Sequence, residues 1–313
     1  MGASKNVAKK DSYALDFLEC TFHRAGVAMS SVKKNPRAKL PSPVPEEIPV
    51  PEEVGQEIPQ VKTREYETRK WGYQLAKLGI EGLDERIKGI LRGRSYLVTG
   101  ETGTGKTLFS LTFLMEGLRS NEPGIYVLVD EDYDDFMNGV YDFGWDFEQF
   151  IKARKLRILT LMPDFVEKMR NKPVDTVVMS IVDGILREAR LIGAQRLVID
   201  PVAPLIVNEG DVAWTREYIK SLIINLEKRI GATTLIVSEI PTGSTALSRY
   251  GVEEFLATGV FVLGIERIKN AFYRTLYVRK MRWRPVPPQL FVFDIVRGKG
   301  VVVRGELNTI LRE

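Results

Sequence analysis

The feature that most constrains the fold of this chain is an eight-residue loop, Gly100-Glu101-Thr102-Gly103-Thr104-Gly105-Lys106-Thr107. A short apolar run at 96–99 leads into the loop, and a segment with helical spacing, 107–118, follows it. The loop fits the pattern G-x-x-x-x-G-K-S/T, and a strand before it and a helix after it are the context that the motif requires. The sequence therefore predicts a strand–loop–helix unit of an α/β domain at this place.

The residue types of the loop suit the binding of a nucleoside triphosphate. Gly103 and Gly105 allow the backbone to turn its N–H groups toward phosphate oxygens without a Cβ in the way. The N-terminus of the following helix adds a partial positive charge. In loops of this kind the lysine, here Lys106, reaches the β- and γ-phosphates, and the hydroxyl at the position of Thr107 ligates Mg²⁺. We therefore expect ATP and Mg²⁺ as ligands, with all eight residues of the loop in the nucleotide site.

Strand and helix patterns alternate along the chain from residue 75 onward. Apolar runs predict buried strands at 125–129, 157–161, 196–199 and 233–237, and helical spacing predicts helices over 178–189 and 219–230. Continuous Val/Ile/Leu strands between amphipathic helices are typical of a parallel sheet covered on both faces. After Gly259 the helical patterns stop, and runs at 260–263, 275–278 and 290–293 predict an antiparallel extension of the sheet.

Carboxylates follow two of the predicted strands. Asp200 ends the run 196–199 in a Walker B arrangement, where it can hold the water shell of Mg²⁺ beside Thr107. Asp130 and Glu131 follow the run 125–129, which we expect next to the phosphate loop. Either carboxylate could activate the attacking water, or both could belong to an acidic helix start that favours the helix dipole. The local sequence leaves these two interpretations open.

The first 70 residues differ in composition from the rest. Residues 1–40 are rich in lysine, and residues 41–59 combine repeated prolines with glutamates. Such a segment buries too little apolar surface to fold alone, so we expect a flexible tail and linker over 1–70 and an ATPase domain over 71–313. Residues 13–29 could form a short docking helix at the end of this linker.

Composition excludes several classes of protein. The single cysteine, Cys20, rules out an internal disulfide framework, and the single histidine, His23, makes a His/Cys zinc site implausible. The lone cysteine makes a reducing cytoplasm the expected compartment, and no apolar run in the sequence approaches the length needed to span a bilayer. The net charge of +4 permits nucleic-acid binding without arguing for it.

Several ordered motifs resemble the KaiC-like branch of the RecA superfamily of ATPases, over about residues 78–303. Besides the loop, the matching stretches are Leu78-Gly-Ile-Glu-Gly-Leu-Asp84, Val129-Asp130-Glu131-Asp132, Phe143-Gly-Trp-Asp146, Leu197-Val-Ile-Asp200, Val237-Ser-Glu239, Gly251-Val-Glu-Glu-Phe-Leu256 and Val278-Arg-Lys-Met-Arg282. The resemblance implies a RecA-like P-loop NTPase fold. It also implies catalytic carboxylates, with Glu131 as the base and Asp130 standing where the family usually has glutamate.

The resemblance further implies ring-shaped homo-oligomers, commonly hexamers, with ATP bound between subunits. Lys280 and Arg282 would then face the γ-phosphate of the neighbouring subunit. The namesake of the family autophosphorylates an adjacent Ser/Thr pair in its second domain. Here that stretch carries Glu253 and Glu254, and there is one ATPase domain, so autokinase activity is not expected.

Three functional hypotheses follow. The first is a Mg²⁺-dependent ATPase that acts as a ring and couples hydrolysis to regulation or to a protein partner. The second is a recombinase-paralogue role on single-stranded DNA, because residues 267–284 mix basic and aromatic side chains. The third is a slow nucleotide-sensing switch that signals through the N-terminal tail.

Overall fold

The computed structural model describes residues 73–160, 165–206, 211–244 and 246–310. The predicted tail over 1–70, the candidate helix over 13–29, Cys20 and His23 all lie outside the described residues. The boundary between tail and domain therefore stays a prediction. Among the helices that are described, none is long and apolar enough to cross a membrane.

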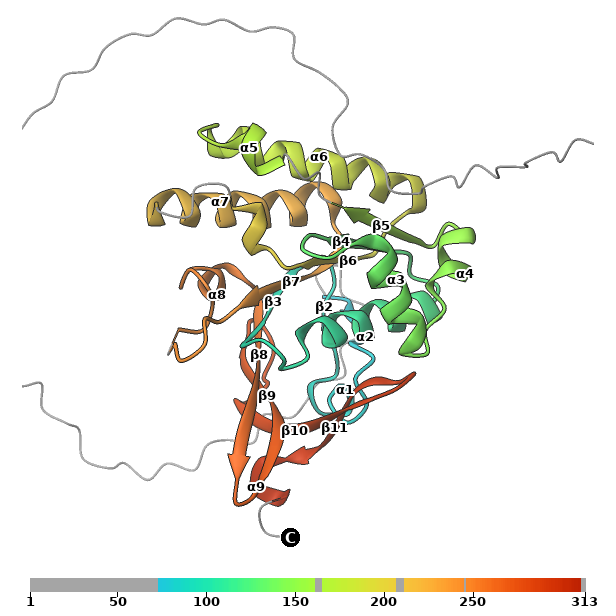
Figure 1. Cartoon of the computed structure of the whole chain (residues 1–313), viewed down its shortest axis with the longest axis vertical. Helices are drawn as coiled ribbons and strands as arrows, with labels where there is room; N and C mark the ends of the chain where they lie inside the picture. Colours follow the sequence, from blue (N-terminus) through green and yellow to red (C-terminus); the bar gives the residue numbers. More distant parts are fainter. Residues whose placement is uncertain (1–72, 161–164, 207–210, 245, 311–313) are drawn as a thin grey trace, which may run out of the picture. The chain divides into compact units, whose positions relative to one another are not determined.

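A nine-stranded mixed sheet forms the centre of the described part of the chain (Figure 1). Its strands are β3 (Ser95–Gly100), β4 (Gly124–Leu128), β5 (Leu156–Thr160), β6 (Arg196–Asp200), β7 (Thr233–Glu239), β8 (Gly259–Ile268), β9 (Ala271–Met281), β10 (Gln289–Val296) and β11 (Gly300–Glu306). Their order across the sheet is β11-β10-β9-β8-β3-β7-β6-β4-β5. The strands from β8 to β5 are parallel neighbours, while β9, β10 and β11 pair antiparallel. A separate antiparallel pair joins β1 (Leu75–Ala76) and β2 (Ile90–Leu91).

Helices lie on both faces of this sheet. They are α1 (Asp84–Ile87), α2 (Lys106–Arg119), α3 (Tyr133–Asp142), α4 (Phe147–Lys152), α5 (Phe165–Met169), α6 (Val174–Ile192), α7 (Val212–Asn225), α8 (Glu253–Leu256) and α9 (Leu307–Ile310). A 3₁₀ turn covers Ala203–Leu205, and a π-helical turn, Leu226–Ile230, continues α7. Figure 1 shows α6 and α7 on one side of the sheet and α2 on the other.

The core is divided into two layers because successive strand residues point to opposite faces. In β4 and β6, Tyr126 and Val198 pack in the layer that holds the buried face of α2. Their neighbours Ile125 and Leu197 pack in the layer beneath α6 and α7. The predicted doubly covered parallel sheet with an antiparallel C-terminal extension is confirmed.

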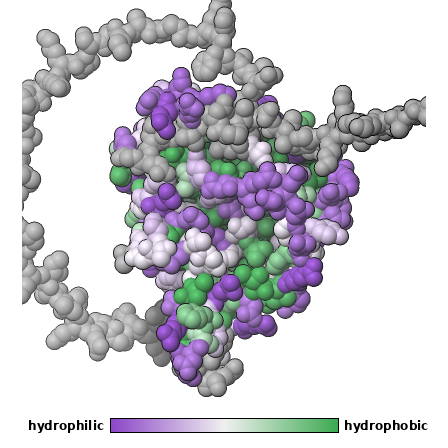
Figure 2. Space-filling model, in the orientation of Figure 1, coloured by the Kyte–Doolittle hydropathy of each residue, from purple (hydrophilic) through white to green (hydrophobic). Residues whose placement is uncertain are grey.

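Surface hydropathy differs between the two ends of the face drawn in Figure 2. Hydrophilic side chains cover much of the upper part, whereas hydrophobic side chains gather lower down, where the C-terminal strands lie. Exposed apolar side chains in those strands include Ile265, Phe272 and Leu290.

Two sequence expectations about the fold are wrong. The strand β4 does not lie next to the strand that feeds the phosphate loop, because β7 and β6 are inserted between β4 and β3. Helical structure also does not stop after Gly259, since the short helix α9 follows β11. The sequence does not give the strand order, because strands that follow one another along the chain need not be neighbours in a parallel sheet, where a crossover can skip positions.

Candidate active site

The glycine-rich loop connects β3 to α2 in a conformation that needs glycine. Gly103 and Gly105 have φ values of +81° and +102°, in the left-handed region that disfavours other residues. No heavy atom lies within 4 Å of the position that a Cβ on Gly103 would take, so the backbone there is open to the pocket. A Cβ on Gly105 would lie 3.0 Å from Cδ1 of Ile295.

The remaining residues of the loop divide into two groups. Thr102, Lys106 and Thr107 line the pocket together with the two glycines. Glu101 and Thr104 instead hold the loop in shape. The Thr104 hydroxyl donates to the carbonyl of Glu101 at 2.8 Å, and the backbone N–H of Gly243 donates to the Glu101 carboxylate at 3.1 Å. Gly100 is the last residue of β3.

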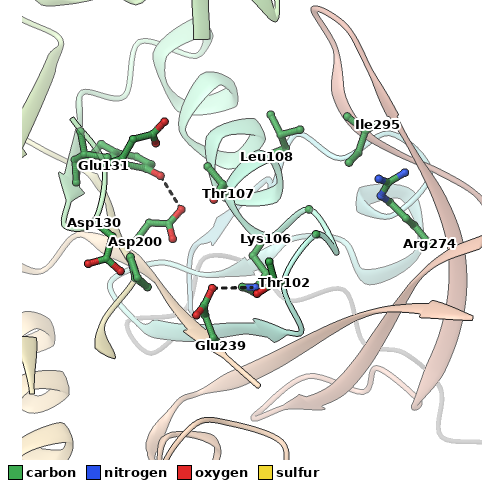
Figure 3. A pocket seen from close by; sticks show the side chains of 15 residues that line it. Thr102, Lys106, Thr107, Leu108, Asp130, Glu131, Asp200, Glu239, Arg274 and Ile295 are labelled. Carbon is green, nitrogen blue, oxygen red and sulfur yellow. Dashed lines mark hydrogen bonds and ion pairs between the residues drawn. The ribbon is translucent and has the colours of Figure 1, made fainter. Parts of the chain in front are cut away.

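Lys106 is a buried cation at the floor of the pocket. Its Nζ donates to the carbonyl of Glu101 at 2.9 Å and lies 3.8 Å from Oε1 of Glu239, at the end of β7 (Figure 3). Burial lowers the pKa of the Lys106 ammonium, and the charges of Glu239 and Asp200 partly oppose this effect. A poorly solvated ammonium beside one distant carboxylate gains free energy from a closer anion, as a triphosphate would supply.

Asp200 ends β6 within reach of the first turn of α2. The hydroxyl of Tyr126 donates to its Oδ2 at 2.7 Å, and Thr107 lines the same pocket. Burial raises the pKa of Asp200, although the Tyr126 hydroxyl, the Thr107 hydroxyl and Lys106 act in the opposite direction. A hydroxyl and a carboxylate that line one pocket fit Mg²⁺, which in phosphoryl-transfer sites takes few protein ligands and completes its shell with water and phosphate. No cluster of three His, Cys, Asp or Glu side chains that could hold a metal is found among the described residues.

Asp130 and Glu131 lie at the mouth of the same pocket, between β4 and α3. They reach it because the carboxyl ends of all the parallel strands meet at one edge of the sheet, even though β4 is not beside β3. Partial burial raises the pKa of Glu131, and the charges of Asp200 and Asp135 raise it further. Partial burial also raises the pKa of Asp130, with Glu239 adding to the effect and Arg249 opposing it.

The acidic helix start that competed with the catalytic interpretation belongs to the next residues. Asp132 caps α3, because its carboxylate accepts the backbone N–H groups of Asp134 and Asp135. Asp130 and Glu131 precede that cap and line the pocket instead. The helix-cap interpretation therefore holds for Asp132, while Asp130 and Glu131 remain candidates for the catalytic role.

The pocket has a second wall that the sequence did not indicate. The pocket has a volume of about 460 Å³, and its second wall consists of Arg274 of β9 and Ile295 of β10 together with Leu108. Figure 3 shows Arg274 and Ile295 on the opposite side of the loop from Asp130, Glu131 and Asp200. Tyr126 was missed as well. No local sequence pattern marks Arg274, Ile295 or Tyr126, because the order of the strands in the sheet brings them to the pocket. Glu239 also lines the pocket, and it does have a sequence signal, since it is an acid at the end of a buried strand.

Lys280 and Arg282 do not line the pocket of their own chain. The Nζ of Lys280 donates to the carbonyls of Glu254 and Ala257, each at 2.8 Å, and to that of Phe255 at 3.1 Å. Arg282 donates to the carbonyl of Phe255 at 2.8 Å. Burial and the neighbouring charge of Arg282 lower the pKa of Lys280 to about 8, with Glu254 opposing. Both cations therefore sit at the C-terminal end of α8, where helix carbonyls lack partners.

Several cations of the basic and aromatic stretch 267–284, which suggested single-stranded DNA, have separate positions or partners. Arg274 lines the pocket, Lys280 and Arg282 bind carbonyls of α8 and its C-cap, and Arg284 donates to the carbonyl of Ile87 at 2.9 Å. The exposed aromatics Phe272 and Trp283 lie near opposite ends of the stretch. These placements give no observation in favour of the nucleic-acid hypothesis.

Comparisons with known proteins agree on one family. A family model described as "ATPase: KaiC" matches residues 76–308. The UPF0273 protein PH0284 of Pyrococcus horikoshii is 31% identical over 237 residues, which covers 72% of this chain and 92% of that protein. The crystal structure of the KaiC-like protein PH0186 from Pyrococcus horikoshii superimposes with a TM-score of 0.62 at 35% identity, covering 74% of this chain and 99% of that one.

Longer relatives match over part of their length. The circadian clock oscillator protein KaiC of Prochlorococcus marinus is 34% identical over 215 residues, which covers 68% of this chain and 42% of the clock protein. The chain thus spans less than half the length of the clock proteins that it matches, whereas it spans nearly all of the single-domain archaeal relatives.

Proposed function

This chain belongs to the KaiC family of ATPases in the RecA superfamily, and we propose that it binds ATP with Mg²⁺ in the pocket described above and hydrolyses it. The observation that carries the proposal is the convergence of Lys106, Thr107, Asp200 and Glu131 on one cavity beside the open loop. These four supply a phosphate-binding cation, two metal ligands and a base, which is the set that phosphoryl transfer to water requires.

Each side chain has a separate role in this proposal. The backbone of the loop and Lys106 hold the phosphates, and Glu131 accepts a proton from the attacking water. Asp130 lines the same pocket one residue before Glu131, and we assign it to holding the water rather than to taking its proton. Thr107 and Asp200 would hold Mg²⁺, which when bound neutralises charge on the phosphoryl oxygens.

The second wall accounts for the remainder of the nucleotide. With the phosphates along the loop and the carboxylates on one side, the base would extend toward Arg274 and Ile295. A planar guanidinium and a branched apolar side chain can pack against the two faces of an aromatic base. This arrangement supports a preference for a nucleotide over inorganic polyphosphate.

Removal of the metal tests the proposal as a whole. Phosphate release from ATP is measured for the full chain with Mg²⁺ and again with an excess of chelator. We expect release to stop on chelation, because without the metal the carboxylate of Asp200 adds negative charge beside the phosphates. Equal release in both conditions would show that the activity belongs to a contaminant or to another site.

The pH dependence of the rate should report Glu131. A base works only when deprotonated, so kcat/KM is expected to rise with pH through the pKa of Glu131 and to level above it. Since burial, Asp200 and Asp135 raise that pKa from 4.5, the rise should lie at higher pH than for an ordinary glutamate. In Asp135→Asn one repelling charge is lost, and the rise should move to lower pH. An unmoved or upward-moved profile would exclude Glu131 as the titrating base.

We place the active form in a homo-oligomeric ring, a hexamer, with ATP between subunits. Lys280 and Arg282 lie outside the pocket of their own chain, on a surface at the end of α8. Carbonyl oxygens carry no net charge, so Arg282 keeps its charge for the γ-phosphate of a neighbour, and Lys280 does so below its lowered pKa of about 8. Such cations acting in trans stabilise the charge of the transition state.

A mixing experiment tests the trans role. Lys106→Ala and Lys280→Ala are each expected to hydrolyse ATP poorly, but an equimolar mixture should recover activity. In mixed rings about a quarter of interfaces would join an intact loop to an intact Lys280, if subunits assort at random across head-to-tail contacts. Arg279→Ala is the matched control, because Arg279 is an exposed neighbour on the same strand and should leave the rate unchanged. A mixture no more active than its components would contradict catalysis in trans.

Hydrolysis is proposed to occur without autophosphorylation at the stretch that precedes β8. Glu253 stands there with its carboxylate buried, accepting hydroxyl hydrogens from Ser238 at 3.0 Å and Ser248 at 2.7 Å. A buried carboxylate that accepts two hydrogen bonds links β7 to the segment before α8, and it offers no hydroxyl to a phosphoryl donor. We assign the ATPase domain to residues 71–313 and a regulatory, partner-binding role to residues 1–70.

A further inference from the structure

One motif of the sequence has no part in the site as described so far. The stretch Phe143-Gly-Trp-Asp146 follows α3, on the side of the sheet that holds α2, and none of its residues lines the pocket. Its tryptophan is nevertheless almost completely buried, with 2% of its surface exposed. A buried indole needs a partner for its N–H group, and here that partner is far away in the sequence.

The turn formed by this motif binds the tip of the β10–β11 hairpin. The Nε1 of Trp145 donates to the carbonyl of Gly298 at 2.9 Å, and the N–H of Gly298 donates to the carbonyl of Phe143 at 2.7 Å. Arg297 adds a third bond, from its Nε to the carbonyl of Asp142 at 2.7 Å. Figure 1 shows the hairpin tip beside the C-terminal end of α3.

Both turns carry a glycine in the left-handed conformation, and Gly298 has a φ of +73°. Gly144 has a φ of +96°, and a Cβ at this position would lie 3.4 Å from the Cα of Gly298. The ring of Phe143 packs edge-on against that of Trp145, with 4.6 Å between their centroids. The indole N–H is therefore held in a fixed direction toward the hairpin.

The clamped hairpin carries one wall of the pocket. Ile295 lies three residues before Gly298 and contacts the loop at Gly105, while Arg274 lies opposite Phe293 on the adjacent strand. The other end of α3 follows directly on Asp130 and Glu131. One short helix thus joins the carboxylates at one side of the pocket to the hairpin that forms the other side.

We propose that Trp145 is a positioning residue for nucleotide recognition, which acts by fixing the β10–β11 hairpin so that Ile295 and Arg274 pack against the base. This inference rests on the proposed function, since it concerns the same pocket. It adds that the affinity gained from the base depends on the turn that follows α3. The phosphate-binding loop, which lies between β3 and α2, keeps its own affinity.

The test compares two ligands that share the phosphates and differ in the base. Binding of the non-hydrolysable analogue AMP-PNP and of inorganic tripolyphosphate, each with Mg²⁺, is measured by calorimetry on the full chain. In Trp145→Phe the ring is kept and the N–H donor is lost. We expect AMP-PNP to bind about threefold to tenfold more weakly, as for loss of one hydrogen bond, with tripolyphosphate unchanged. Arg297→Ala removes an exposed side chain from the same clamp and should show the same selective loss. It tests the inference independently, should Trp145→Phe fold poorly.

Lys299→Ala serves as the matched control. Lys299 lies in the same hairpin turn, but it forms an exposed ion pair with Glu81, so both ligands should bind as in the wild type. If Trp145→Phe and Arg297→Ala weaken the binding of both ligands equally, the turn only supports the fold in general, and the inference is overturned. Unchanged binding of both would overturn it as well. A wild-type chain that binds neither ligand would instead refute the proposed function itself.

Discussion

Replacement of Lys106 by alanine is expected to weaken ATP binding by on the order of 10²-fold or more. Truncating one partner of a buried charge pair typically costs about 2–5 kcal/mol, and Lys106 is the cation at the floor of the pocket. Titration of a fluorescent ATP analogue, together with the rise in melting temperature that ATP produces, measures the effect. The stabilisation by ATP should disappear in this variant.

The fold should survive this substitution. The Nζ of Lys106 has one short bond, to a backbone carbonyl, and its contact with Glu239 is long. Lys299→Ala, which removes an exposed lysine elsewhere, is the control and should bind ATP normally. An affinity within twofold of the wild type in Lys106→Ala would show that ATP does not use this loop.

Substitution of Glu131 by glutamine is expected to separate binding from chemistry. The amide keeps the size of the side chain but cannot accept the proton of water, so the single-turnover rate should fall by about 10²- to 10⁴-fold. ATP affinity should stay within a few-fold of the wild type, because Glu131 lies at the mouth of the pocket and not on the phosphate-binding loop. Rapid-quench measurement of one turnover gives the rate without the contribution of product release.

Asp130→Asn is the matched comparison, because it makes the same chemical change one residue away. Its rate should fall less, since Asp130 holds the water without taking its proton. A larger loss in Asp130→Asn than in Glu131→Gln would assign the base to Asp130 instead. Similar affinity with unchanged rates in both variants would leave the pocket without a base and contradict the proposed chemistry.

The sequence was most informative where chemistry and local structure depend on the same residues. The loop needed glycine at Gly103 and Gly105, a strand before it and a helix after it, and all of these were readable from neighbouring residues. Asp200 was found in the same way, as an acid that ends an apolar strand. Buried strands can also be recognised in the sequence, because the strands of a parallel sheet covered on both faces are nearly continuous apolar runs.

What the sequence could not supply was the order of the strands and the contacts that depend on it. Arg274 and Ile295 reach the loop because β9 and β10 follow β8 at the side of β3, and no local pattern marks that arrangement. Lys280 was expected beside a phosphate, but within its own chain it lies among carbonyls of α8 and its C-cap. Its role in a neighbouring subunit therefore stays a proposal that the mixing experiment decides.

The claim that this pocket turns over ATP is tested most directly by steady-state phosphate release from three proteins measured in parallel. These are the wild-type chain, Lys106→Ala and Glu131→Gln, each as the full chain with Mg²⁺ and saturating ATP. We expect phosphate release by the wild type and nearly none by either variant. ATP affinity should be lost in Lys106→Ala and kept in Glu131→Gln. Equal rates in all three proteins would contradict the assignment of ATP hydrolysis to this site.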